Sequence, residues 1–105
     1  MNKVLLLSLF LCFTACGDRS APLVGVILPL SGGFSADGIG ALAGLRVLEA
    51  ELGENPSCRF VVMDNFSNPR ESVRCVTELY EEGCSLIVGP AYSSSSIAAS
   101  RGARE

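Results

Sequence analysis

The sequence has no histidine and no tryptophan, and its basic residues form no cluster. Without histidine the chain has no imidazole to serve as a general base or as a metal ligand. Eight Lys and Arg residues against eleven Asp and Glu residues give a formal net charge of −3. A protein that binds nucleic acid needs a basic surface for the phosphate backbone. The composition therefore excludes imidazole chemistry, and we expect no nucleic-acid partner.

Cysteine is present, but its spacing predicts no cofactor chemistry. Cys58, Cys75 and Cys84 are arranged neither as a zinc ribbon nor as a CxxC redox motif. We expect either one disulfide bond or buried thiols among these three residues, with no metal site and no cofactor. With 105 residues, of which 49% are hydrophobic, the chain is long enough for one small domain with an apolar core.

The opening residues, MNKVLLLSLFLCFTAC, are typical of an export signal. Lys3 supplies the positive charge, residues 4–13 form an apolar run that is short for a bilayer span, and small residues precede Cys16. The ending FTAC resembles the lipobox of bacterial lipoproteins. We predict a lipoprotein signal peptide over 1–15, with Cys16 as the lipidated first residue of a tether over 16–22. A plain secretory signal or a membrane anchor are the alternatives, with Cys16 then an ordinary thiol.

Beyond the tether, apolar runs alternate with helical patterns. Three runs without strict alternation predict buried parallel strands, and apolar residues three or four positions apart predict amphipathic helices between them. The order β-α-β-α-β-α predicts an α/β fold with a parallel sheet and helices on both faces. The strands are expected at 23–28, 59–64 and 85–89, and the helices on a stripe from Ile39 to Leu52, over 70–82, and after a turn in which serines cap the last helix.

Polar or small residues follow all three predicted strands, over 31–35, 64–68 and 89–96. In parallel sheets of this kind, ligands bind outside the carboxyl ends of the strands. The carboxyl edge is therefore the candidate site.

A dinucleotide-binding enzyme is a weaker interpretation of the glycines in this region. Residues 38–43 fit G-x-G-x-x-A, but the first glycine of that motif belongs in the turn directly after the strand. Here Gly38 lies well beyond the strand that ends at Leu28. We expect Gly38, Gly40 and Gly44 to give the loop flexibility and to allow a small-residue helix face to pack closely on the sheet. Serines without a histidine base predict no nucleophilic catalysis, and no enzyme is expected.

Three segments together resemble the type I periplasmic binding proteins, especially the branched-chain amino acid receptors of ATP-binding-cassette (ABC) importers. They are VGVILPLSGGFSADGIGALAGLRVLEAEL, VVMDNFSNPRESVRCVTELYEEG and LIVGPAYSSSS. The resemblance covers about Leu23 to Ser100. It implies that residues 23–105 are part of the N-terminal lobe of an extracytoplasmic receptor. Such a receptor binds an amino acid or similar small carboxylate between two lobes and delivers it to an ABC permease in the inner membrane. A sensing or envelope-assembly lipoprotein with the same fold is the alternative.

The resemblance also implies which residues contact the ligand. Ser93, Ser94 and Ser95 occupy the segment in which a hydroxyl group and helix-terminal amides hold the ligand carboxylate, with Ser93 as the first choice. Hydroxyl groups and unpaired N–H groups at a helix N-terminus suit an anion. Ser31 and Gly32 belong to the loop that covers the ligand from the first lobe.

Other positions of the resemblance differ from the family pattern. Asp37 stands where a bulky apolar or aromatic residue is common, and it either caps the following helix, which we favour, or pairs with a ligand ammonium group. Asp64 and Asn65 are expected to brace the loops. Ser67 and Tyr92 occupy the positions of the disulfide bond found in classical members.

Overall fold

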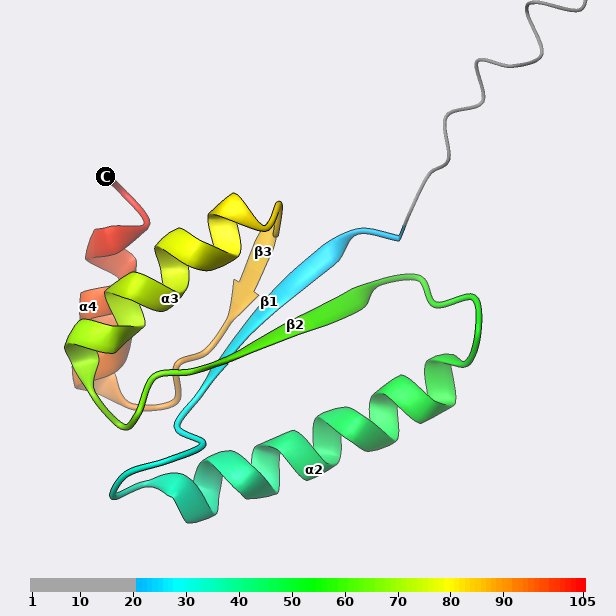
Figure 1. The fold of residues 1–105 in the computed structure, drawn as a ribbon, viewed down its shortest axis with the longest axis horizontal. Coiled ribbons are helices and arrows are strands. Elements are labelled where there is room, and N and C mark those ends of the chain that lie inside the picture. Colours follow the sequence, from blue (N-terminus) through cyan, green and yellow to red (C-terminus); the bar gives the residue numbers. More distant parts are fainter. Residues whose placement is uncertain (1–20) are drawn as a thin grey trace, which may run out of the picture.

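The computed structural model describes residues 21–105, so the predicted signal peptide over 1–15 and the lipidation site at Cys16 lie outside the described residues. The predicted order of strands and helices is confirmed (Figure 1). The elements are β1 (Leu23–Leu28), α2 (Ser35–Leu52), β2 (Arg59–Asp64), α3 (Pro69–Glu81), β3 (Leu86–Val88) and α4 (Ser93–Gly102).

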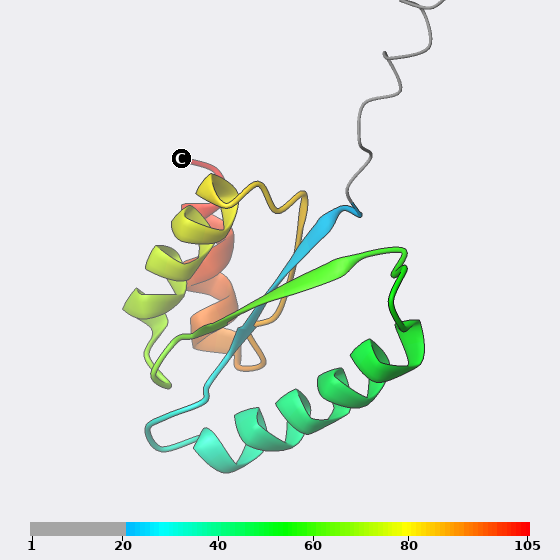
Figure 2. The same ribbon diagram turned by 45° about the vertical axis from the view of Figure 1, so that its right-hand side comes forward.

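The three strands form one parallel sheet in the order β2-β1-β3. β1 pairs with β2 along its whole length, from Leu23 opposite Arg59 to Leu28 opposite Asp64. α2 lies on one side of the sheet, and α3 and α4 lie together on the other (Figures 1 and 2). Covered on both faces, the central strand β1 has no polar side, which is why its sequence is a continuous apolar run.

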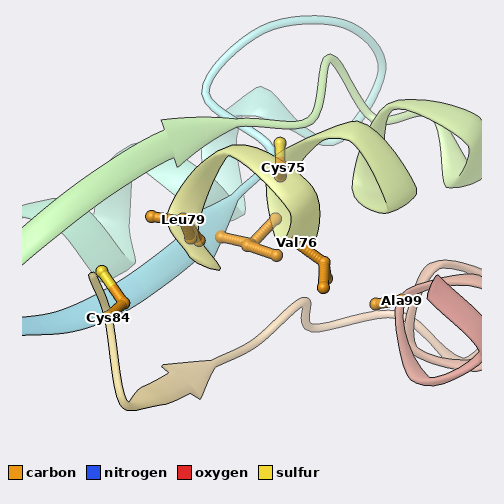
Figure 3. Packing of buried hydrophobic residues seen from close by; sticks show 6 residues of the cluster. Cys75, Val76, Leu79, Cys84 and Ala99 are labelled. Atoms are coloured by element: carbon orange, nitrogen blue, oxygen red, sulfur yellow. The ribbon is translucent and has the colours of Figure 1, made fainter. Parts of the chain in front are cut away.

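The core lies between the sheet and the pair α3 and α4. It consists of Ile27, Cys75, Val76, Leu79, Cys84 and Ala99, five of which are labelled in Figure 3. Gly25 of β1 allows this approach, since an added Cβ would lie 2.8 Å from a methyl group of Leu79. Close packing of α3 on β1 therefore depends on a small residue in the strand.

α2 buries less of its predicted apolar stripe than the sequence indicates. Leu42, Leu45 and Leu52 are half-buried, whereas Ile39 is 57% exposed and Leu48 is 42% exposed. The less exposed side of α2 is a row of residues three and four positions apart that includes Leu42, Leu45 and Leu52. Ile39 and Leu48 lie beside this row and are exposed. None of the helices between residues 21 and 105 combines the length and the apolar character that a bilayer span requires.

The two later helices begin differently. Asn68 caps α3 by accepting a hydrogen bond from the backbone N–H of Arg70 (2.9 Å), and Pro69 fills the first helical position. The predicted serine cap of α4 is wrong: the N-cap residue is Tyr92, and no side chain caps the helix. The hydroxyl group of Ser96 instead donates to the carbonyl of Pro90 (2.7 Å).

Cys58, Cys75 and Cys84 are free thiols. The sequence predicts either one disulfide bond or buried thiols, and Cys75 and Cys84 are buried thiols. Cys58 is half-buried. Burial raises the pKa of the Cys75 thiol and of the Cys84 thiol, which lowers the fraction of reactive thiolate at neutral pH.

Iodoacetamide at neutral pH is therefore expected to alkylate Cys58 at least about tenfold faster than Cys75 or Cys84, because those two thiols are buried and their raised pKa lowers their thiolate fraction. Peptide mapping by mass spectrometry resolves the three sites. The same reaction in urea is the control, and there the difference should disappear. Equal rates in the folded protein would contradict the burial of Cys75 and Cys84.

Candidate functional site

Three loops meet at the carboxyl edge of the sheet. They join β1 to α2, β2 to α3 and β3 to α4, and they leave the sheet at the same end, at the lower left of Figure 1. This arrangement follows from the parallel strands, and it places the three polar segments expected from the sequence along one edge.

Asp64, the last residue of β2, joins the first two loops. Its carboxylate accepts hydrogen bonds from the backbone N–H groups of Leu30 (2.9 Å), Ser31 (3.3 Å) and Phe66 (2.7 Å), and from the hydroxyl group of Ser31 (2.7 Å). Burial by itself would raise the pKa of Asp64, but these four hydrogen bonds outweigh it and hold the pKa below its ordinary value. The carboxylate is therefore a brace between loops.

The turn after β2 is held by side chains as well. Phe66 and Ser67 both have positive φ (54° and 56°), a conformation that is costly for residues other than glycine. The buried Asn65 side chain accepts from the N–H of Ser67 (3.1 Å) and donates to Ser72 (3.0 Å). Ser67 then donates to the carbonyl of Ser31 (2.7 Å). The prediction that Asp64 and Asn65 brace the loops is confirmed.

Two aromatic residues join the first and third loops. The rings of Phe34 and Tyr92 are stacked with centroids 4.1 Å apart and planes at 28°. The hydroxyl group of Tyr92 donates a hydrogen bond to the Asp37 carboxylate. That hydrogen bond raises the pKa of Tyr92, and burial and the Asp37 charge raise it further.

The prediction that Asp37 caps α2 is wrong, because Phe34 is the N-cap residue and Asp37 lies in the first turn with its carboxylate on Tyr92. The sequence patterns predict no role for Phe34 and none for the Tyr92 side chain. A signal for both is present in the sequence, since each is an aromatic residue in a segment, 31–35 or 89–96, that is otherwise made of small and polar residues.

The structure places the predicted ligand-contacting serines at the start of α4. Ser93 and Ser94 are exposed, while Ser95 is 4% exposed and faces inward. The backbone N–H groups in the first turn of a helix have no partner within the helix, and no side chain caps α4. This end of α4 thus presents N–H groups and two exposed hydroxyl groups.

The other two predicted contacts have structural roles in the first loop. The hydroxyl group of Ser31 donates to Asp64, as described above. Gly32 has φ of +82°, and an added Cβ would lie 2.7 Å from the carbonyl oxygen of Phe66. Glycine at this position lets the first loop lie against the second.

The glycines of the G-x-G-x-x-A segment lie inside α2 and not in a turn after β1, so the dinucleotide interpretation is wrong. Close packing is expected from the sequence at Gly38, Gly40 and Gly44. It is found only at Gly38, where an added Cβ would overlap the carbonyl oxygen of Pro29. At Gly40 and Gly44 an added Cβ would meet nothing within 4 Å.

Two hollows of the described residues lie away from this edge. One of about 690 Å³ is lined by α3, β3 and the end of α4, and one of about 300 Å³ lies between the end of α2 and the start of β2. Neither contains a residue that the sequence analysis placed in the site. Among residues 21–105, no three Cys, Asp or Glu side chains are grouped as a metal site would require.

The described residues form a partial domain with the type I periplasmic binding protein fold, as the resemblance predicts. The structural neighbours are substrate-binding proteins of ABC transporters. One is the branched-chain amino acid transporter protein LivJ from Streptococcus pneumoniae, solved with isoleucine, which is 25% identical with a TM-score of 0.73. Another is the leucine-binding protein LivK from Thermotoga maritima, 28% identical with a TM-score of 0.68. A third is a solute-binding protein from R. palustris, solved with benzoate, 27% identical with a TM-score of 0.68.

The match covers most of this chain but a small part of each neighbour. It includes 81%, 77% and 81% of this chain and 26%, 24% and 25% of LivJ, LivK and the R. palustris protein, respectively. The chain thus spans about a quarter of the length of these proteins. Comparison with protein-family models gives no match, and neither does comparison with curated proteins.

Proposed function

We propose that the chain is part of the N-terminal lobe of an extracytoplasmic solute-binding receptor for an ABC importer. Its carboxyl edge contributes to a site for an amino acid or a similar small carboxylate, which lies between this edge and a second lobe. The fold and the three neighbours support this proposal. It assigns no catalytic step to the chain.

The observation that carries the proposal is the uncapped start of α4. A helix N-terminus with free N–H groups stabilises a negative charge. Here four consecutive serines begin the helix, yet none of them caps it, and the exposed hydroxyl groups of Ser93 and Ser94 remain available as further donors. We propose that this end of α4 holds the solute carboxylate, with Ser93 as the main side-chain contact.

The remaining parts of the proposal concern location and partners. Lipid attached to Cys16 anchors the receptor to a bacterial membrane, and the tether over 16–22 joins the anchor to β1. The receptor delivers its solute to an ABC permease in the inner membrane. The export-type opening sequence and the FTAC ending support the anchor, and the names of LivJ and the R. palustris protein support the transporter partner.

Ser93→Ala is expected to weaken binding of the solute by about tenfold or more, because a hydrogen bond to a charged group contributes about 1.5–3 kcal/mol. The measurement is calorimetric titration of the complete gene product with isoleucine, leucine and benzoate as probes.

The matched control is Ser100→Ala, which removes an exposed serine of the same helix whose hydroxyl group bonds within α4. It should bind like the wild type. If none of a panel of amino acids and small carboxylates binds the wild type, the proposed function is wrong. If Ser93→Ala and Ser100→Ala bind equally well, the role given to Ser93 is wrong.

A further inference from the structure

The loop between β3 and α4 has fewer side-chain ties to the rest of the edge than the other two loops have. Asp64 and Ser67 join the first loop to the second by several hydrogen bonds. Among the described residues, the side-chain hydrogen bond that joins the third loop to the other side of the edge is the one from Tyr92 to Asp37 in the first turn of α2, and the Phe34 stack accompanies it. The side-chain tie between the third loop and the start of α2 therefore depends on Tyr92.

Tyr92 also stands at the start of α4. It is the N-cap residue of α4 in an extended conformation, and its carbonyl accepts the first helical hydrogen bond, from the N–H of Ser96 (2.8 Å). Phe34, its stacking partner, is the N-cap residue of α2. The aromatic pair thus connects the starts of two helices that lie on opposite sides of the sheet (Figures 1 and 2).

We propose that Tyr92 is a positioning residue of the solute site. Its ring on Phe34 and its hydroxyl group on Asp37 fix the start of α4 against the β1–α2 loop. The exposed serines of α4 and the loop around Ser31 therefore keep a constant separation before the solute arrives. A site held in its binding geometry loses less conformational freedom when the ligand binds. The role of Tyr92 in a solute site rests on the proposed function, whereas its contacts with Phe34 and Asp37 do not depend on that function.

The first test asks whether the hydroxyl group of Tyr92 is held by Asp37 in solution. Tyrosine labelled with ¹³C at Cζ reports the ionisation of each phenol by NMR, and the Tyr92 signal is the one missing from Tyr92→Phe. In the wild type, Tyr92 should ionise at higher pH than an ordinary tyrosine, because deprotonation breaks the hydrogen bond and places two negative charges together. Asp37→Asn should return the ionisation toward the ordinary value. An identical titration in both proteins would overturn the proposal.

The second test measures backbone hydrogen exchange in the complete gene product, for Tyr92→Ala and Tyr92→Phe. In Tyr92→Ala the amides of 31–38 and of 96–99, the first hydrogen-bonded amides of α4, should exchange at least tenfold faster, while those of β2 (59–64) keep their rates. Tyr92→Phe keeps the stack but loses the hydroxyl group, so its rates should fall between those of the wild type and Tyr92→Ala. The matched control is Tyr80→Ala, at a tyrosine that is 78% exposed, and its exchange should match the wild type.

Two results of this test would overturn the proposal. Unchanged exchange in 96–99 would show that Tyr92 does not hold the start of α4, and a uniform increase through β2 would show a general stabilising role. Neither test requires a solute, so their failure is distinct from the failure of the proposed function. If exchange changes as expected but isoleucine, leucine and benzoate all fail to bind, the positioning role stands and the assignment of the solute fails.

Discussion

Alanine at position 38 is expected to destabilise the protein, whereas alanine at position 40 is expected to stabilise it. Both glycines lie in α2, and in an isolated helix both substitutions would stabilise by about 0.5–1 kcal/mol, because glycine loses more backbone entropy on folding. At Gly38, however, the new methyl group would overlap the carbonyl oxygen of Pro29, a backbone atom that has no rotamer to change. Overpacking of this kind costs about 1–3 kcal/mol or more.

The measurement is urea unfolding of Gly38→Ala, Gly40→Ala and the wild type, followed by circular dichroism. The two variants have the same composition, so their difference reports the position alone. We expect Gly40→Ala to be more stable than the wild type and Gly38→Ala to be less stable, with a gap of about 2 kcal/mol or more. If the two variants unfold at the same urea concentration, α2 does not approach the end of β1 as described.

The contrast between these glycines illustrates what a sequence can predict. Both are glycines of the same helix, and the sequence analysis treated them alike. They differ only in the direction that each faces, since Gly38 contacts Pro29 and Gly40 faces open space. That direction depends on how the helix axis crosses the sheet, which is a tertiary property.

The elements themselves were predictable where local signals agree with tertiary packing. β1 and β2 have the predicted bounds, because a short apolar run followed by turn residues is recognisable without knowing its neighbours. α3 begins after Asn68, with Pro69 in its first position, and ends shortly before Gly83, and all three residues are signals in the sequence.

The candidate site was predictable as an edge but not as a set of contacts. The polar segments after the strands indicated the edge, and the roles of Asp64 and Asn65 as braces followed from their place. The Phe34–Tyr92 stack joins residues far apart in the chain, and no local pattern specifies that pairing. The prediction of a serine cap for α4 is wrong for a related reason. A serine can cap a helix only where the backbone presents its hydroxyl group to the N–H groups, and here Tyr92 occupies the N-cap position.

Asp64→Ala is expected to destabilise the protein by about 3 kcal/mol or more, because it leaves four donors of the first and second loops without their acceptor. A donor that loses its partner inside a protein costs about 1–3 kcal/mol, and those exposed to water cost less. Asp64→Asn keeps the shape of the side chain and one acceptor oxygen, so the expected loss in the free energy of unfolding is smaller, about 1 kcal/mol. That loss measures how much the negative charge of Asp64 contributes to stability. Urea unfolding at neutral pH measures both. Equal stability of Asp64→Ala and the wild type would contradict the bracing role.

The same carboxylate should make stability depend on acid. The pKa of Asp64 is lower in the folded protein than its ordinary value of 3.8, so the unfolded chain binds the proton more readily. Its contribution is therefore fully present above pH 3.8 and is lost as the pH falls through that value toward the folded pKa. Urea unfolding at a series of pH values should show this loss in the wild type and a shallower loss in Asp64→Asn. Glu51→Gln, at an exposed helix position, controls for the change in net charge.

An equal acid dependence in Asp64→Asn and the wild type would mean that the four hydrogen bonds do not favour the ionised carboxylate. The first and second loops would then have to be held together mainly by Ser67.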